Sequence, residues 1–251
     1  MIYEKISAAR QQHKKLFALL IDPDKNSVSD LMRTAQLAEE ALVDILLVGS
    51  SILLENGVDD CVRILREHCQ LPIVLFPGNT LQVSSKADAI LFLSLISGRN
   101  PDLLIGQHVI AAPFIKNSGI EALATGYLLI DSGAPTSASY MSQTMPIPHD
   151  KNDIAAATAL AGEMLGMKLF YLDAGSGARY TVSNDMVKKV RSAVDSPIIV
   201  GGGIKTPEKV ITLCEAGADV IVVGNSVEEN PELLFSLAAA AHSSNQSSAV
   251  R

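Results

Sequence analysis

The chain has 251 residues, of which 48% are hydrophobic, 19% charged and only 4% aromatic, and it contains no tryptophan. This composition excludes disordered and collagen-like proteins, and because charged residues interrupt every long apolar run it also excludes a membrane-spanning protein. Twenty basic and 27 acidic residues give a net charge of −7, which is the wrong sign for a protein dedicated to binding nucleic acids.

Short apolar runs alternate with helical patterns along the whole chain. The runs are continuously apolar rather than alternately apolar and polar, which is typical of parallel β-strands covered on both faces. In chain order, the predicted strands are Leu16–Asp22, Asp44–Gly49, Pro72–Pro77, Ala89–Leu95, Gly126–Asp131, Lys168–Ala174, Pro197–Val200 and Val220–Gly224.

Helical patterns lie between most of these strands. One of them has a clear start signal, because Thr206 can cap the helix and Pro207 suits its first position. In chain order, the predicted helices are Ser29–Leu42, Val58–Cys69, Pro101–Lys116, Asn152–Leu165, Ser183–Val194, Thr206–Ala216 and Pro231–Ala241.

Strand and helix patterns alternate without a break in composition. They predict an α/β protein with one domain over residues 1–242, a TIM-type (β/α)8 barrel. A doubly wound open sheet is the alternative. Residues 77–88 are too few for a crossover helix with two loops, so we expect the third helix of the barrel to be missing or replaced. The loop 132–150 is expected to be a lid or binding loop, and the tail 243–251 to be disordered.

The cysteines predict a reduced protein. They are odd in number, and Cys61 and Cys69 lie too far apart along their predicted helix to form a disulfide. We therefore expect buried, inert thiols. The N-terminus lacks the basic-then-apolar order of a signal peptide, so the protein is expected to be cytoplasmic. The five histidines are scattered and show no metal-binding spacing.

Three consecutive predicted strands end in glycine-rich turns, at 173–177, 201–204 and 224–226. In a barrel, the carboxyl ends of the strands build the active site. Residues without side chains there let backbone N–H groups approach an anion closely, so the turns predict a phosphate-binding site. The turn at Gly175 lacks the third glycine of the dinucleotide-binding motif, and no P-loop lysine follows any glycine run.

Polar side chains follow other strands at the same edge. Asp22 ends the first predicted strand and Asp24 follows it, where carboxylates beside a phosphate would suit Mg²⁺, although Asp-Pro-Asp is also an ordinary turn sequence. Ser50 or Ser51, after the second strand, could supply a hydroxyl to the same ion. Asp173 is placed to act as a general base. Tyr171 shares its face of the strand, although it could equally be a core aromatic.

These residues together resemble a known family. The segments Tyr171–Ala178, Gly201–Ile204, Gly224-Asn225 and Leu20–Lys25 are similar to those of geranylgeranylglyceryl phosphate synthases, which also include the bacterial heptaprenylglyceryl phosphate synthases. The resemblance extends from about residue 17 to 234. It implies a modified barrel whose third helix is missing or replaced, which leaves a side groove for an isoprenoid chain.

The resemblance further implies a prenyltransferase. It would join a prenyl group, most often geranylgeranyl, from its diphosphate to the 3-hydroxyl of sn-glycerol 1-phosphate, with Mg²⁺ held by Asp22 and Ser51 and with Asp173 as the base. A homo-oligomer and a transient contact with a membrane surface for product release are also implied. The glycerol phosphate would contact Tyr171, Leu172, Asp173, Ala174, Gly175, Ser176, Gly177, Gly202, Gly203, Gly224 and Asn225.

One position departs from the family pattern, because the family usually has glutamate where this chain has Asp173. The shorter side chain requires a closer strand or a bridging water. Two alternatives to the prenyltransferase remain open. One is a phosphate-binding barrel isomerase or synthase of sugar or amino-acid metabolism, which would not explain the missing helix. The other is a catalytically silent protein that binds a prenyl diphosphate.

Overall fold

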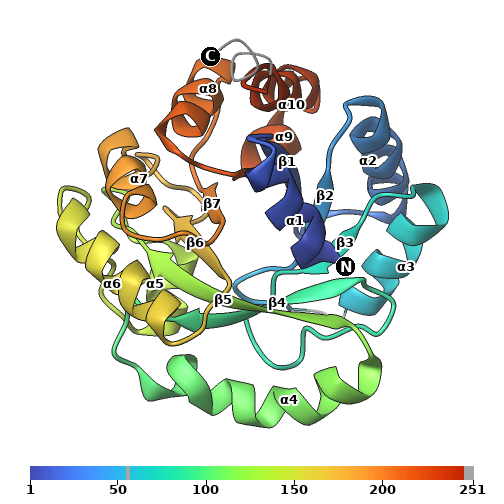
Figure 1. Cartoon of the computed structure of the whole chain (residues 1–251). Coiled ribbons are helices and arrows are strands. Elements are labelled where there is room, and N and C mark those ends of the chain that lie inside the picture. Colours follow the sequence, from blue (N-terminus) through green and yellow to red (C-terminus); the bar gives the residue numbers. More distant parts are fainter. Residues whose placement is uncertain (55–56, 246–251) are drawn as a thin grey trace.

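Eight parallel strands close into a single barrel in chain order in the computed structural model (Figure 1), which describes residues 1–54 and 57–245. The first strand pairs with the last, with Leu16 opposite Val220, so the open doubly wound sheet is excluded. The strands are β1 (Leu16–Ile21), β2 (Ile45–Val48), β3 (Ile73–Leu75), β4 (Ala89–Leu95), β5 (Glu121–Leu129), β6 (Leu169–Asp173), β7 (Ile198–Gly201) and β8 (Val220–Val223).

Helices surround this barrel. Every predicted helix is found, and the predicted start at Thr206 is confirmed, because the Thr206 side chain accepts a hydrogen bond from the Lys209 N–H. The helices are α1 (Ile2–Gln11), α2 (Val28–Glu40), α3 (Val58–His68), α4 (Gln107–Ser118), α5 (Ser137–Ser142), α6 (Asn152–Met164), α7 (Asn184–Arg191), α8 (Pro207–Ala216), α9 (Asn225–Glu229) and α10 (Leu233–Ser243). A 3-10 turn (Pro23–Lys25) and a π-helical turn (Asp102–Gly106) precede α2 and α4.

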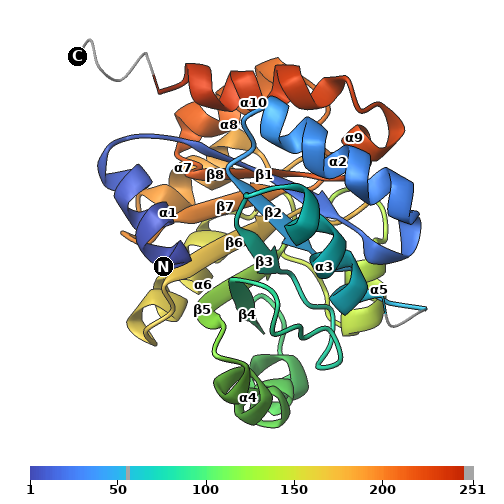
Figure 2. The same cartoon turned by 90° about the vertical axis from the view of Figure 1, so that its right-hand side faces the viewer.

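The ring lacks a helix between β3 and β4, as expected. Residues 76–88 instead form a loop that is held by the buried Gln82 side chain. Its amide nitrogen donates to the Ser50 carbonyl at 2.8 Å, and its amide oxygen accepts from the Gly78 N–H at 3.2 Å. The next helix, α4, lies beside β4 and β5 at the edge of the molecule (Figure 2). The side of the barrel at β3 and β4 is therefore covered by a loop rather than by a packed helix.

Alternation along each strand divides the core into two layers. Leu169 and Tyr171 of β6 pack inside the barrel, whereas Phe170 and Leu172 of the same strand pack against the helices. Side chains of successive residues point to opposite faces of a strand, so a continuously apolar run fills both layers at once. This explains why most of the strands show no regular alternation of apolar and polar residues in the sequence.

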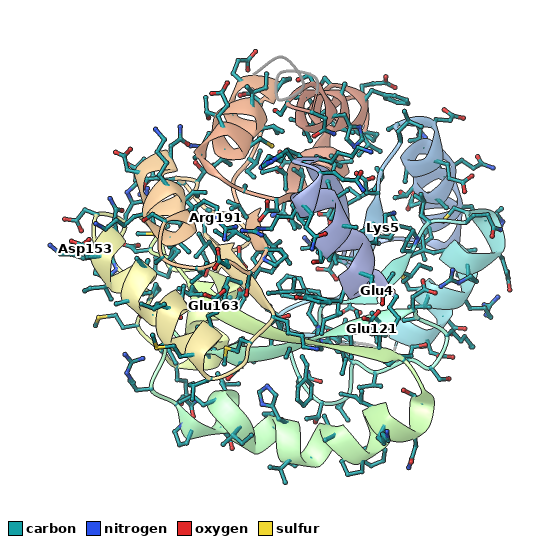
Figure 3. All side chains as sticks on the ribbon, in the orientation of Figure 1. Glu4, Lys5, Glu121, Asp153, Glu163 and Arg191 are labelled. Carbon is teal, nitrogen blue, oxygen red and sulfur yellow. The ribbon has the colours of Figure 1, made fainter. Side chains whose placement is uncertain are left out.

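The amino end of the barrel is covered by α1, which the sequence analysis did not predict. Its Ile6 packs into the inner core. Glu121, at the start of β5, accepts hydrogen bonds from the Ile2 and Tyr3 N–H groups, at 2.5 and 3.3 Å. A carboxylate at a helix N-terminus satisfies free N–H groups and favours the helix dipole. Figure 3 shows Glu121 beside the first turn of α1.

Several predicted boundaries differ from the structure, and two of these differences change the description of the fold. The strand β5 begins at Glu121 rather than at Gly126, since residues 121–125 pair with β4 in register. The last helix includes Ser243, and the Asn245 amide donates to the Lys15 carbonyl at 3.4 Å. Order therefore extends at least three residues into the predicted tail. The rest of that tail, 246–251, lies outside the described residues.

The three cysteines are free and buried, as expected. Burial raises the pKa of the Cys61 thiol to about 12, which keeps it protonated and unreactive. Among the helices of the described residues, none has the length and apolarity needed to cross a membrane.

Candidate active site

One large cavity of about 940 Å³ opens at the carboxyl ends of the strands. Its mouth is formed by the turns after β1, β2, β6, β7 and β8. From the mouth it continues as a groove between β4 and α4, where apolar side chains line it. The predicted polar residues and the predicted side groove thus belong to a single continuous space.

Backbone without side chains forms one wall of the mouth. Gly175, Gly177, Gly202 and Gly203 all have positive φ angles, between 72° and 87°, a conformation that favours glycine. A Cβ atom on Gly202 would lie 2.7 Å from the Gly175 nitrogen. The turns after β6 and β7 therefore touch backbone to backbone at Gly202, which is required by both conformation and space, whereas Gly177 is favoured by conformation alone.

The turn after β8 joins this wall through side chains. The Asn225 amide nitrogen donates to the Ser176 hydroxyl at 2.9 Å, which connects the turns after β8 and β6. The Asn225 amide oxygen accepts from Lys25 at 3.5 Å, and Lys25 also lies 3.1 Å from Glu228. All of these residues line the cavity together with Gly224. The predicted phosphate site is thus brought together as one surface.

Leu172 and Ala174 are the exceptions among the predicted phosphate-binding residues. Both side chains pack in the outer core beneath the helices, and neither lines the cavity. Only their backbone atoms could face a ligand, so their predicted contacts remain predictions about backbone groups.

Asp173, at the end of β6, is buried at the base of the mouth with 7% of its surface exposed. One carboxylate oxygen accepts from the Tyr127 hydroxyl at 2.5 Å, and the other accepts from the Gly175 N–H at 2.7 Å. Burial raises the pKa of Asp173 above its ordinary value, while both hydrogen bonds oppose that change. The carboxyl group is therefore fixed in orientation and more basic than an exposed aspartate.

Tyr127 is a site residue that the sequence analysis missed. It lies on β5 opposite Tyr171, and the two rings meet edge to face with centroids 5.6 Å apart. The Tyr171 ring also stacks on Phe76 at 5.1 Å. Burial raises the pKa of both tyrosines well above the usual value, so both hydroxyls stay protonated. Strand alternation with Leu129, two residues further on, could have placed Tyr127 on the inner face.

Asp22 lies where β1 ends and its side chain is 17% exposed. One of its oxygens accepts a hydrogen bond from the Ser50 hydroxyl at 3.1 Å and lies 3.7 Å from the Lys25 nitrogen. The predicted ligand Ser51 lines the same cavity, but the hydroxyl that donates to Asp22 is that of Ser50.

The groups around Asp22 are oxygen donors of the kind that Mg²⁺ takes in proteins. Among the described residues there is no group of three or more His, Cys, Asp or Glu side chains that could enclose a metal. Mg²⁺ does not need such a group, since it takes one or two carboxylates and completes its octahedron with phosphate oxygens and water. Asp22 with a serine hydroxyl, on the rim of a phosphate-sized mouth, fits that pattern.

Two aromatic rings line the groove. The His108 ring of α4 meets the Phe92 ring of β4 edge to face, with centroids 4.5 Å apart. His108 Nδ1 is buried and has no hydrogen-bond partner among the described residues, and burial lowers the pKa of this histidine. The lining continues beyond this pair to Ile90 of β4 and Ile115 of α4.

Carboxylates outnumber cations around the cavity. Among its described lining residues the cations are Lys25 and Lys205. The carboxylates are Asp22, Asp24, Asp102, Asp173, Glu228 and Glu229.

Comparisons with known proteins agree with this geometry. The PcrB family model matches residues 9–241. Proteins named geranylgeranylglyceryl phosphate synthase from Spirosoma linguale and Chitinophaga pinensis are 55% and 52% identical over 234 and 241 residues, which cover 93% and 96% of this chain and 94% and 96% of theirs. The crystal structure of (S)-3-O-geranylgeranylglyceryl phosphate synthase from Thermoplasma acidophilum, in complex with its substrate sn-glycerol-1-phosphate, has a TM-score of 0.91 and 33% identity, covering 97% of this chain and 99% of that one.

Proposed function

The chain belongs to the PcrB family, and from this premise we propose that it is a prenyltransferase that joins a prenyl group to the 3-hydroxyl of sn-glycerol 1-phosphate. The prenyl donor is a diphosphate, and the products are an ether-linked glycerol phosphate and diphosphate. The observation that carries the proposal is the position of Asp173, which lies in one cavity between the glycine turns and the apolar groove.

Two parts of the cavity would bind the two substrates, one for each. The turns at Gly175–Gly177 and Gly202-Gly203 offer backbone N–H groups to the glycerol phosphate. The groove beside Phe92 offers apolar surface to the isoprenoid chain. The reacting atoms would then meet above Asp173. Holding an alcohol and an allylic carbon in this arrangement supplies a large part of the rate enhancement.

Asp173 would take the proton from the 3-hydroxyl of the glycerol phosphate. The freed electron pair on that oxygen forms the new bond to the first carbon of the prenyl chain. The bond from that carbon to the diphosphate breaks, and its electrons leave with the diphosphate. The hydrogen bonds from Tyr127 and Gly175 hold the carboxylate in position, and the raised pKa makes it a stronger base.

Mg²⁺ is the cofactor we propose, held by Asp22 together with the hydroxyl of Ser50 or Ser51. When bound, the ion would offset the charge that develops on the departing diphosphate. Asp22 would orient the diphosphate toward the groove, and Lys25 lies close enough to both Asp22 and Asn225 to contact the same group.

Geranylgeranyl is the prenyl group that we propose. The relatives described above are named geranylgeranylglyceryl phosphate synthase, and Phe92 and His108 line the apolar groove that would hold the chain. The groove also argues against a barrel isomerase of small sugar phosphates, because such a substrate would leave it empty.

The test is product formation. The purified protein is incubated with Mg²⁺, labelled sn-glycerol 1-phosphate and prenyl diphosphates of several lengths, and the label is then extracted into organic solvent. We expect labelled lipid, most with the geranylgeranyl donor, and none after chelation of the metal. Absence of labelled lipid with every donor would refute the transferase. Undiminished product after chelation would refute the magnesium assignment alone.

A further inference from the structure

A second pocket of about 710 Å³ lies outside the active-site mouth, between the first turns of α7 and α8. Its lining includes one carboxylate, Asp185, among the described residues. Four cations line it as well, and we call them the basic pocket residues: Arg179, Lys188, Lys205 and Lys209. This local excess of positive charge occurs in a chain whose net charge is −7.

These cations are not used in ion pairs. Within residues 1–54 and 57–245, the ion pairs found in the structure include none of the four. The neighbouring Lys189 is different, since it lies 3.1 Å from Asp153 on α6. Asp153 projects from the outer edge of α6 (Figure 3). Lys189 is thus paired with a carboxylate, whereas the four basic pocket residues are not.

The cations come from three separate segments. Arg179 follows the turn after β6, Lys188 belongs to α7, and Lys205 precedes α8, whose first turn contributes Lys209. The Lys209 nitrogen is half-buried and donates to the Asn184 side-chain oxygen at 2.9 Å, which holds it against the pocket. Cations converging from several directions suit an anion with several oxygens, and phosphate is the common biological group of that kind.

The charge that lines this pocket is opposite in sign to the charge that lines the active-site cavity. The cavity mouth is rich in carboxylates and repels free anions, so it depends on backbone amides to hold a phosphate. The basic pocket has the opposite sign and begins where the mouth ends, because Gly203 and Lys205 line both spaces. An anion attracted to this rim would arrive directly beside the glycine turns.

We propose that the basic pocket is a second phosphate-binding site, separate from the site at the glycine turns. This inference goes beyond the proposed transfer reaction and does not depend on it, since Asp173 does not line the pocket. The phosphate can come from a free phosphorylated metabolite that waits at the rim, or from the headgroup of an anionic lipid at a membrane surface. The two sources share the same chemistry at the protein.

The first experiment uses inorganic phosphate as the probe. Phosphate is titrated into the full-length, isotope-labelled protein at low salt, and the backbone amide signals of Asn184 and Asp185 are followed by NMR. The amides of Gly175 and Gly177 report on the active-site turns in the same spectra. We expect saturable shifts at α7 with a dissociation constant of their own. Lys188→Gln should raise that constant about fivefold, the upper range for one exposed charge, and leave the glycine signals unchanged.

Lys189→Gln is the matched control, because it removes the same charge from the next position of the same helix. It should leave phosphate binding at α7 unchanged. Lys188 is exposed, so its substitution should not disturb folding, and the double variant Arg179→Gln/Lys188→Gln should abolish the α7 shifts. Absence of saturable shifts at α7 in the unmodified protein, or an equal loss in Lys188→Gln and Lys189→Gln, would overturn the proposal.

The second experiment separates the sources. The protein is floated with vesicles of phosphatidylcholine alone or mixed with phosphatidylglycerol. Flotation with the mixed vesicles that phosphate competes away, and that Lys188→Gln weakens, assigns the pocket to a lipid headgroup. Shifts with inorganic phosphate but no flotation assign it to a free phosphorylated molecule. Flotation that Lys188→Gln leaves unchanged would contradict a role of this pocket at membranes.

Discussion

Two opposing influences act on the pKa of Asp173. Burial disfavours its charge, and the hydrogen bonds from Tyr127 and Gly175 favour it. Burial is the larger of the two, so the pKa remains raised. A group that must accept a proton and then release it works best when its pKa approaches the operating pH. Position 173 is therefore occupied by a carboxylate whose surroundings suit a base.

Replacing Asp173 by asparagine tests its role. Asp173→Asn keeps the size of the side chain but removes the basic oxygen, so kcat should fall by about 10²- to 10⁴-fold. Binding of sn-glycerol 1-phosphate, measured by calorimetry, should change little. Asp102→Asn is the control, because Asp102 also lines the cavity but lies on the groove side. Undiminished turnover in Asp173→Asn would remove Asp173 as the base, and a silent binding protein would show no turnover in either form.

The pH dependence follows from the sign of the pKa change. The base must be ionised, so the acid limb of kcat/KM should lie above pH 3.8, the ordinary value for aspartate. The free energy of unfolding should change with pH in the opposite sense to activity. The raised pKa of Asp173 contributes stability that is present at low pH and is lost as the pH rises through that pKa. In Tyr127→Phe a hydrogen bond to the ionised form is lost, and the acid limb should move to higher pH. A limb that stays in place would contradict the contact.

For single residues, the sequence indicates which residue types form the site better than it indicates which groups they contact. The glycine turns, Asp22 and Asp173 all lie at the predicted mouth, because strand ends fix them along the chain. The choice between Ser50 and Ser51 depends on which way a turn faces, and no sequence pattern determines that. Tyr127 and Gln82 were missed for a similar reason, since each acts through a partner distant in sequence.

The connection from β3 to β4 is the element that distinguishes this barrel. Its shortness predicts the missing helix, because a crossover helix needs more residues than 77–88 provide. What the sequence cannot show is how the gap is filled. The Gln82 side chain fixes the loop to β2, and α4 is left to form the far wall of the groove. Since both depend on long-range contacts, local patterns do not reveal them.

The width of the groove at Phe92 should influence the preferred donor length. Phe92→Ala removes one ring of the Phe92–His108 contact and widens the groove at that point. The ratio of kcat/KM for a longer donor to that for geranylgeranyl diphosphate should therefore rise about tenfold or more, since each buried methylene contributes roughly 0.8 kcal/mol. Phe114→Ala is the control, because Phe114 of α4 is 67% exposed and does not line the cavity. An unchanged ratio in Phe92→Ala would mean that Phe92 does not limit the chain.

Secondary structure was predictable where a pattern repeats and a terminus is signalled. Strand β4 has the predicted bounds, and α8 starts after its predicted cap. The helix α1 was missed because its sequence has few apolar residues, and Ile6 is its buried side chain. The first half of β5 was missed because Glu121 and Thr125 interrupt the apolar run. Both exceptions concern residues whose burial depends on the closed barrel.

The two ends of the barrel have different roles: residues at the amino end stabilise the fold, and residues at the carboxyl end form the candidate active site. The amino end is closed by α1, and polar side chains there hold backbone groups: Glu121 binds the start of α1, and Glu163 accepts from the Asp195 and Ser196 N–H groups at 2.8 and 2.7 Å. The carboxyl end holds the glycine turns and the buried aspartate. Barrel enzymes typically divide their conserved roles in this way.

The closed end gives a stability prediction. Glu121→Gln removes the charge that caps α1 and should lower the free energy of unfolding by about 1 kcal/mol. The melting temperature should fall by about 2–4 °C for a chain of this size. Glu40→Gln, at an exposed position of α2 where no side-chain hydrogen bond or ion pair is found among the described residues, is the control and should change the melting temperature little. Activity at low temperature should persist in both variants. An equal effect of the two would contradict the capping role.

The measurement that tests the account most directly is the comparison of two acceptors that differ only in handedness. With the phosphate at the glycine turns and the reacting hydroxyl beside Asp173, only one enantiomer can satisfy both contacts together. With geranylgeranyl diphosphate and Mg²⁺, kcat/KM for sn-glycerol 1-phosphate should exceed that for sn-glycerol 3-phosphate by about 100-fold or more. Equal use of the two acceptors would contradict this placement of the site.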